Sequence, residues 1–321
     1  MSAGTDDPGS YRCAAASADR DEPLVGTAST VRSFVLVEHA GPWGVDALRD
    51  ARMPPGADAL REAVRRGASR ARVRALLIRR PRGSAAAPSG GVRVFGVRAD
   101  AHEPWVESAV LSDWAAVADL DLARLGAGLS LGLPRVEEAV ALVCTHGRHD
   151  VCCAERGRPV AAALAASHPE QTWETSHIGG DRYAANLLLL PDGLYHGRVT
   201  AEVAPRILDA LLDGQVSPPW LRGRSGLRMG VQAAELALRE HLGERGVRAL
   251  RVVSWRPAGD ERVDPGGTAR WRHLPSGRTY EVVVTARRGP ASQLTCRAAG
   301  SGSPWGWSTV VRPDQSDIPA T

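Results

Sequence analysis

Most of what this 321-residue chain says about its architecture lies in residues 140–181, VALVCTHGRHDVCCAERGRPVAAALAASHPEQTWETSHIGGD. The run VALVC is apolar throughout and predicts a buried strand that ends at Cys144. GRPVAAALAASH (157–168) predicts a helix whose proline stands in the first turn, where proline is tolerated. QTWETSH (171–177) alternates in polarity and predicts a second strand, which the next two glycines end. The segment therefore predicts a strand, a helix and a strand.

Two more strands and a helix follow. AANLLLL (184–190) and LYHGRV (194–199) predict a hairpin, because the sequence PDG between them is a turn signal. TAEVAPRILDALLDG (200–214) predicts a helix with Thr200 as its N-cap. The order strand, helix, strand, strand, strand, helix predicts an α/β sandwich of thioredoxin type within residues 134–215.

The flanking regions predict two further units. Residues 1–133 form an N-terminal α/β unit, in which 1–27 are loop-like and the expected strands are 30–39, 74–81 and 91–100, with helices at 44–52, 57–71 and about 113–126. Residues 216–321 form a C-terminal unit, which opens with the loop-like SPPWLRGRSG (217–226) and continues with a helix at 231–242. An antiparallel meander is then expected from the stretches 247–255, 270–274, 278–286 and 292–298.

Composition excludes several classes of protein. The net charge is only +4, and all 40 basic residues are arginine, which indicates a compositional bias of the genome. Arginines cluster, as at Arg79, Arg80 and Arg82, without interleaved aromatic residues, so nothing favours nucleic-acid binding. The longest apolar runs, such as LLLL at 187–190, are too short to span a bilayer. The N-terminus is polar without the apolar core of a signal peptide, so we expect a cytoplasmic protein without membrane contact.

Three of the five cysteines lie within ten residues of each other. In a reducing compartment such a cluster indicates a metal site or redox chemistry more than a disulfide framework. The other two, Cys13 and Cys296, stand apart in the sequence. We expect each of them to be an isolated, buried, small hydrophobic residue.

Four residues of the central segment form a candidate ligand set. Cys144 ends the first strand, and Cys153 stands just ahead of the helix, whose N-terminus lowers the pKa of a thiol and stabilises negative charge. His177 ends the second strand, and Asp181 follows across two glycines that allow the backbone to bend close to a cofactor. Two neighbouring strand–loop corners would each supply two ligands, as in a four-ligand metal centre.

The same residues carry a resemblance to a known family. CTHGRHDVCC (144–153), HIGGDRYAANLLLLPDGLYHGRVT (177–200) and the opening segment 21–44 resemble the sucrase/ferredoxin-like family, whose core is a thioredoxin-like [2Fe–2S] ferredoxin. Fungal members of that family hold the cluster through two cysteines in a C-x8-C arrangement and two histidines in H-x-G-G-H. The resemblance implies that Cys144, Cys153 and His177 are ligands of a [2Fe–2S] cluster.

One position departs from the family pattern, because Asp181 stands where the second histidine is found. The resemblance therefore implies a site of two cysteines, one histidine and one aspartate. If Asp181 instead lies outside the coordination sphere, the fourth ligand must be Cys152, His146, His149 or His196. Of these, His146 and His149 are expected at the surface or beside the ligands, Cys152 as a buried supporting thiol, and His196 on the solvent face of its strand.

Several neighbours are expected around the centre. Gly179 and Gly180 would let the loop approach the cofactor, and the arginines at 148, 156, 158 and 182 surround the site. In particular, Arg148 and Arg182 would offset its negative charge, or the arginines together would dock an acidic redox partner protein.

The sequence thus predicts a one-electron carrier or redox sensor more than a catalyst with its own substrate. Two alternatives remain open. Vicinal Cys152 and Cys153 near a helix start would suit a thiol redox enzyme of thioredoxin fold. The spacing C-x8-C…H-x3-D would equally suit a structural zinc site.

Overall fold

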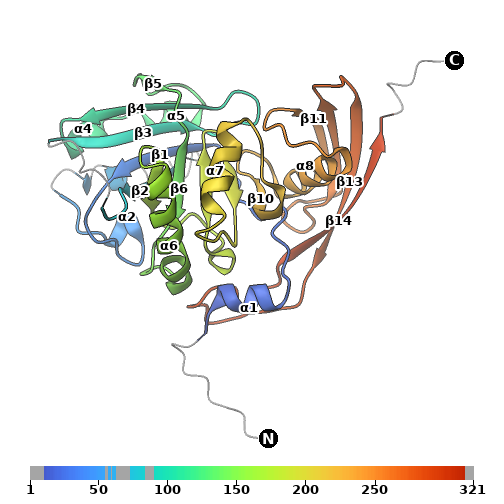
Figure 1. The fold of residues 1–321 in the computed structure, drawn as a ribbon, viewed down its shortest axis with the longest axis horizontal. Helices are drawn as coiled ribbons and strands as arrows, with labels where there is room; N and C mark the ends of the chain where they lie inside the picture. The colour runs from blue at the N-terminus through green and yellow to red at the C-terminus, as the bar shows by residue number, and fades with distance from the viewer. Residues whose placement is uncertain (1–10, 55–56, 59, 63–72, 84–89, 315–321) are drawn as a thin grey trace, which may run out of the picture.

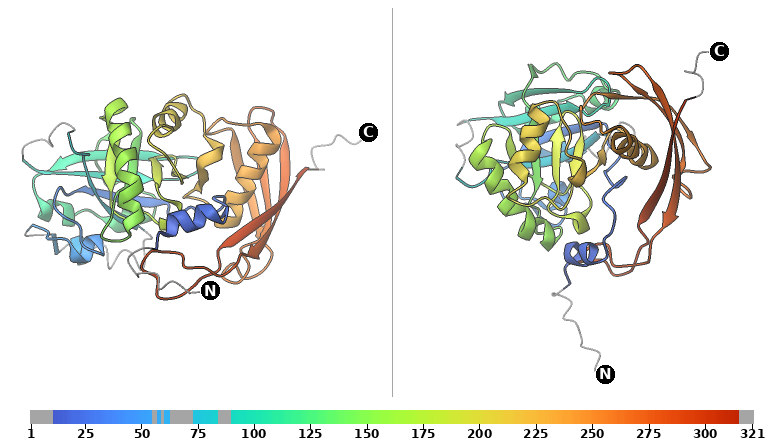
Figure 2. Two further views of the ribbon diagram at one scale, coloured as in Figure 1. Left: turned by 60° about the horizontal axis from the view of Figure 1, so that its bottom comes forward. Right: turned by 45° about the vertical axis from the view of Figure 1, so that its right-hand side comes forward.

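The computed structural model describes residues 11–54, 57–58, 60–62, 73–83 and 90–314. Within these ranges a ten-stranded sheet has the order β10-β9-β8-β6-β7-β2-β1-β3-β4-β5, and a separate four-stranded sheet has the order β11-β12-β13-β14 (Figure 1). Helix α8 (Met229–Leu242) lies between the two sheets, and its apolar side packs on the smaller one (Figure 2).

The thioredoxin-like unit occupies one half of the large sheet. It consists of β6 (Val140–Cys144), α6 (Val151–Ser167), β7 (Thr172–Thr175), β8 (Leu187–Leu190), β9 (Leu194–His196) and α7 (Ala204–Leu212). Strands β6 and β7 are parallel, β8 is antiparallel to β6, and β9 is antiparallel to β8. The strand order β9-β8-β6-β7 is that of the thioredoxin fold, which confirms the predicted architecture.

Helix α6 begins six residues earlier than its predicted start at Gly157. The Asp150 carboxylate accepts a hydrogen bond of 2.9 Å from the backbone N–H of Cys152 and so caps the helix, with Pro159 inside it. A Cβ at Gly157 would stand 2.1 Å from the carbonyl oxygen of Cys144, so the glycine lets α6 lie directly on β6. The early start places both Cys152 and Cys153 in the first helical turn.

The N-terminal region extends the same sheet. Its strands are β1 (Ser33–Glu38), β2 (Val73–Arg79), β3 (Val92–Arg98), β4 (Trp105–Leu111) and the short β5 (Arg135–Val136). The first three are the predicted ones, whereas β4 was not predicted. Because β2 pairs antiparallel with β7, this region is joined to the thioredoxin-like unit by backbone hydrogen bonds.

The helices of the N-terminal region are short. Helix α1 (Cys13–Asp19) lies where a loop was expected, and α2 (Ala47–Asp50) covers part of the predicted 44–52. The single helix expected near 113–126 is two, α4 (Trp114–Ala118) and α5 (Leu122–Gly126), because Asp113 and Asp121 each cap a separate start. Most of the helix predicted at 57–71 lies outside the described residues.

In the C-terminal region the predicted helix and three predicted strands are present, as α8, β11 (Leu250–Pro257), β12 (Gly267–His273) and β13 (Thr279–Arg288). The fourth prediction, 292–298, is wrong, because β14 (Trp305–Pro313) pairs with β13 instead. The expected loop 217–226 contains β10 (Leu221–Arg224), which pairs with β9. Thr200 is not the N-cap of α7, since Val203 precedes the first helical residue.

Among the helices of the described residues, none is both long and apolar enough to cross a membrane.

Candidate metal centre

Three of the four predicted ligands converge on one point. The donor atoms of Cys144, Cys153 and His177 lie within 4.8 Å of one another. Cys144 is the last residue of β6, Cys153 belongs to the first turn of α6, and His177 follows β7, so three elements of the thioredoxin-like unit meet there. Both thiols are buried, whereas a quarter of the His177 side chain (25%) is exposed.

Asp181 borders this group. Its Oδ1 atom lies 2.9 Å from Nδ1 of His177 and 3.5 Å from Sγ of Cys153. The residue opens a short 3-10 turn after two glycines with positive φ, Gly179 (φ 99°) and Gly180 (φ 83°). Glycine adopts that left-handed conformation without the steric cost that a side chain imposes, so the predicted bend of the loop is present.

The buried side chain of Arg222 fixes the glycine turn. Its guanidinium donates to the carbonyl oxygen of Gly179 at 2.9 Å, to Oδ1 of Asn186 at 2.7 Å and to Oγ1 of Thr27 at 3.1 Å. The Asn186 amide in turn donates to the carbonyl oxygen of Gly180 at 2.8 Å. Nothing in the sequence marked Arg222, which contacts the loop from a strand predicted as a linker.

The titration behaviour of the group reflects mutual hydrogen bonding. The contact with Cys153 holds the pKa of Cys144 well below its ordinary value, against the effect of burial, and the same contact raises the pKa of Cys153. Burial lowers the pKa of His177, but the Asp181 carboxylate and the Cys144 thiolate outweigh it and raise the pKa to about 9. Burial raises the pKa of Asp181, yet His177 brings it below the ordinary value. The site therefore favours the anionic forms of Cys144 and Asp181 and the neutral thiol of Cys153.

His146 holds the backbone of the second corner. The residue is buried, its Nδ1 accepts the backbone N–H of His177 at 3.2 Å, and its Nε2 lies 2.7 Å from the carbonyl oxygen of Gly44. A carbonyl can only accept, so the proton resides on Nε2 and the ring is the neutral tautomer. Both ring nitrogens are thus engaged, which makes His146 a positioning residue rather than a ligand. Of the two places expected for it, at the surface or beside the ligands, the structure shows the second.

His149 is the other histidine at the centre. Its ring stacks on that of His177 with 3.8 Å between centroids, and its Nδ1 lies 3.2 Å from the carbonyl oxygen of Val45. Donor atoms of His149, His177 and Asp181 form a second group within 4.8 Å. The geometry therefore keeps His149 beside Asp181 as a candidate for the fourth ligand.

The remaining candidates lie elsewhere. Cys152 turns away, with its Sγ 3.4 Å from Sγ of Cys296. His196 is 1% exposed inside β9, so its expected place on the solvent face is wrong. Arg182 pairs with Glu22 rather than with Asp181, and Arg148 is exposed, with its backbone carbonyl accepting from Arg297.

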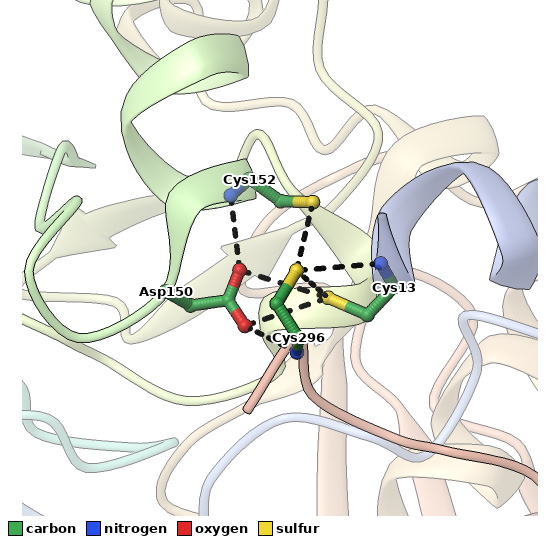
Figure 3. Close-up of side chains that lie close together, drawn as sticks. All are labelled: Cys13, Asp150, Cys152 and Cys296. Atoms are coloured by element: carbon green, nitrogen blue, oxygen red, sulfur yellow. Dashed lines mark hydrogen bonds between the residues drawn. The ribbon is translucent and has the colours of Figure 1, made fainter. Parts of the chain in front are cut away.

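Cys13 and Cys296 are not isolated, contrary to expectation. Both lie against Cys152 and the helix cap Asp150 (Figure 3). Cys13 is 137 positions from Asp150 along the chain, and Cys296 is 146 positions from it. No local spacing pattern could therefore have predicted this group. Of the four residues, only Asp150, which precedes VCCAERG, carries a local sequence signal, because aspartate is a common helix N-cap.

The donors of Cys144, Cys153 and His177, together with the neighbouring Asp181, fit a metal centre. Two thiols, an imidazole and a carboxylate are ligands of the kind that iron–sulfur clusters and zinc use. Nδ1 of His177 is buried and lies 2.9 Å from Oδ1 of Asp181, so the imidazole and the carboxylate stand side by side at this centre.

The comparisons with known proteins concern this same region. Residues 24–223, more than half of the chain, match the sucrase/ferredoxin-like family. Among solved structures, a variant of the thioredoxin-like [2Fe–2S] ferredoxin from Aquifex aeolicus is similar at 19% identity with a TM-score of 0.23, over 26% of this chain and 97% of that ferredoxin. No curated protein matches the chain. On the family match, the chain belongs to the sucrase/ferredoxin-like family.

Proposed function

We propose that the protein is a one-electron carrier or redox sensor, in which Cys144, Cys153, His177 and Asp181 hold a [2Fe–2S] cluster. The convergence of two buried thiols and one imidazole within 4.8 Å, from three separate elements, carries this proposal. The residues are also those that the family resemblance implies as ligands.

The charge of the ligands decides what such a centre would do. A [2Fe–2S] cluster exchanges one electron, and replacing thiolate by neutral imidazole raises its reduction potential. Two thiolates, one carboxylate and one imidazole carry one more negative charge than two thiolates and two imidazoles. We therefore expect a potential between those of all-cysteine and two-histidine centres.

The chain's own residues isolate the sulfur side and expose the histidine side. Cys144, Cys153 and Asp181 are buried, whereas the edge of His177 reaches solvent beside His149. Val45, 43% exposed, lies next to His149 and supplies an apolar contact point at the same place. We propose that a redox partner protein docks on this edge, and that the exposed arginines at 148, 156 and 158 favour an acidic one.

A thiol enzyme is the second candidate, on one observation. The hydrogen bond between Cys144 and Cys153 stabilises the thiolate of Cys144, as in reactive thiol pairs. The predicted pair of Cys152 and Cys153 is not supported, because the two thiols belong to different groups of side chains.

Anaerobic purification of the full chain tests the proposal. We expect a red-brown protein with about two irons per chain and an electron paramagnetic resonance signal after reduction. Cys144→Ser and Cys153→Ser should lose iron and colour, whereas Arg156→Ala, an exposed change on the same helix, should lose neither. A colourless protein with zinc at these four residues, or metal-free protein with a reactive Cys144, would reject the cluster.

The fourth ligand has its own test. Asp181→His should keep the iron and raise the potential, because a neutral ligand replaces an anionic one. His149→Ala should leave the potential of the parent protein nearly unchanged. The opposite pattern would assign the fourth position to His149.

A further inference from the structure

We propose that Cys13, Asp150, Cys152 and Cys296 form a second metal site, which binds one zinc ion and has a structural role. The four side chains offer donor atoms within 4.8 Å of one another, and they are distinct from the cluster ligands (Figure 3). Cys13, Asp150 and Cys152 are buried and Cys296 is half-buried, so the site is closed on most sides.

The distances suit a single ion. Sγ of Cys296 lies 3.4 Å from Sγ of Cys152 and 3.5 Å from Sγ of Cys13. Zn–S bonds of about 2.3 Å in a tetrahedron place two sulfurs about 3.8 Å apart, close to this spacing. Three sulfurs and one carboxylate are also a complete tetrahedral set, whereas a disulfide would leave one thiol over.

The surroundings favour anionic ligands. The backbone N–H of Cys13 donates to Sγ of Cys296 at 3.4 Å, a bond that supports a thiolate. Cys152 stands in the first turn of α6, where the helix dipole is positive.

Asp150 is held in place by two backbone bonds. Its Oδ1 accepts from the N–H of Cys152 at 2.9 Å and its Oδ2 from the N–H of Cys296 at 2.7 Å. Cys13 Sγ lies 3.7 and 3.6 Å from the same two oxygens, in the position of a donor. When zinc binds, the protons of the thiols leave to solvent, the sulfurs bond the ion, and no electron is transferred.

Such a site would fasten three distant parts of the chain. Cys13 begins α1, Asp150 and Cys152 belong to the start of α6, and Cys296 lies on the segment between β13 and β14. Figure 2 shows α1 beside that segment, at the foot of the thioredoxin-like unit. The zinc ion would thereby attach the N-terminal helix and the C-terminal sheet to the helix that also carries Cys153.

Metal analysis of the holoprotein and of two adjacent variants tests the proposal. The parent protein, expressed with zinc in the medium, should contain about one zinc per chain. Cys152→Ser should lose the zinc and keep the iron, and Cys153→Ser should lose the iron and keep the zinc. Cys296→Ser, at the half-buried position, should lose zinc as well. This variant keeps the test valid if Cys152→Ser does not fold. Asp150→Asn keeps an equally good helix cap, so weaker zinc binding there would report the lost anionic ligand.

The outcomes separate this proposal from the cluster. Zinc that is absent from the parent protein and does not bind on titration, or a denatured mass two hydrogens low from a disulfide among these cysteines, would overturn the second site. Iron in place of zinc at these residues would overturn it too. None of these results bears on the colour lost in Cys144→Ser, which reports the first centre alone.

Discussion

Cys152 and Cys153 are neighbours in the first turn of α6, yet their thiols belong to different groups. Sγ of Cys152 lies 3.4 Å from Sγ of Cys296, and Sγ of Cys153 lies 3.5 Å from Oδ1 of Asp181. Successive residues of an α-helix are rotated by about 100°, so one helix start presents two thiols to two sides. The same positive helix end therefore supports anionic ligands in both places.

Replacement of Arg222 by lysine should loosen the loop that carries Asp181. Lysine has no fork of donors to reach Gly179, Asn186 and Thr27 together, so buried acceptors lose their partners. We expect Arg222→Lys to lower the free energy of unfolding by about 1–3 kcal/mol and to accelerate iron loss. Urea unfolding and iron release to a chelator measure the two effects. Arg206→Lys, an exposed arginine, is the matched control, and equal behaviour of the two variants would contradict the assignment.

His146 should matter through His177 rather than by coordination. Loss of its ring leaves the backbone N–H of His177 without its acceptor. We expect His146→Ala to weaken iron retention about 10–100-fold, the usual cost of a group that orients a ligand. His146→Asn offers both an acceptor and a donor and should restore part of it, whereas the exposed His102→Ala should have no effect. Complete loss of the cluster in His146→Asn would instead identify a ligand.

The thioredoxin-like unit was predictable because its signals are local. An apolar run ending at Cys144, a hairpin turn and alternating polarity each depend on neighbouring residues only. The start of α6 was missed because Pro159 suggested a later start, whereas the Asp150 cap sets it earlier. The grouping of Cys144, Cys153 and His177 followed from a topology that brings strand ends together.

The group of Cys13, Asp150, Cys152 and Cys296 was not predictable, for the converse reason. Cys13 and Cys296 meet only through tertiary packing of α1 and the C-terminal segment on α6. Likewise, Arg222 lay in a segment full of proline and glycine, which predicted a linker, although β10 pairs with β9 there. Strand pairing between distant segments overrides such local signals.

His196 should make the fold sensitive to acid. Burial lowers its pKa to about 3, and both ring nitrogens are buried without hydrogen-bond partners. The ordinary value is about 6.5, so between these two values the unfolded chain binds a proton that the folded chain does not. Stability is therefore greatest above about pH 6.5 and falls as the pH falls, by about 2 kcal/mol from this residue at pH 5.

A variant checks this dependence on pH. His196→Leu removes the titrating group from an apolar site, so its unfolding free energy should change less between pH 6.5 and 5 than that of the parent. His102→Leu, at an exposed position, should keep the parent's slope. Urea titrations at several pH values provide the measurement, and identical slopes for all three proteins would assign the acid sensitivity to other groups.

Removal of zinc should release the segment between β13 and β14. Arg297 is exposed and adjoins Cys296, so trypsin cleavage after it requires the segment to leave its place against Asp150 and the carbonyl oxygen of Arg148. We expect a chelator to accelerate cleavage at Arg297 in the parent protein, and Cys296→Ser to show the fast rate without chelator, because local opening controls proteolysis. Cleavage after the exposed Arg262, between β11 and β12 and so away from the segment that joins β13 to β14, serves as the internal control. If chelation leaves the rate at Arg297 unchanged while removing the zinc, the ion does not fasten this segment.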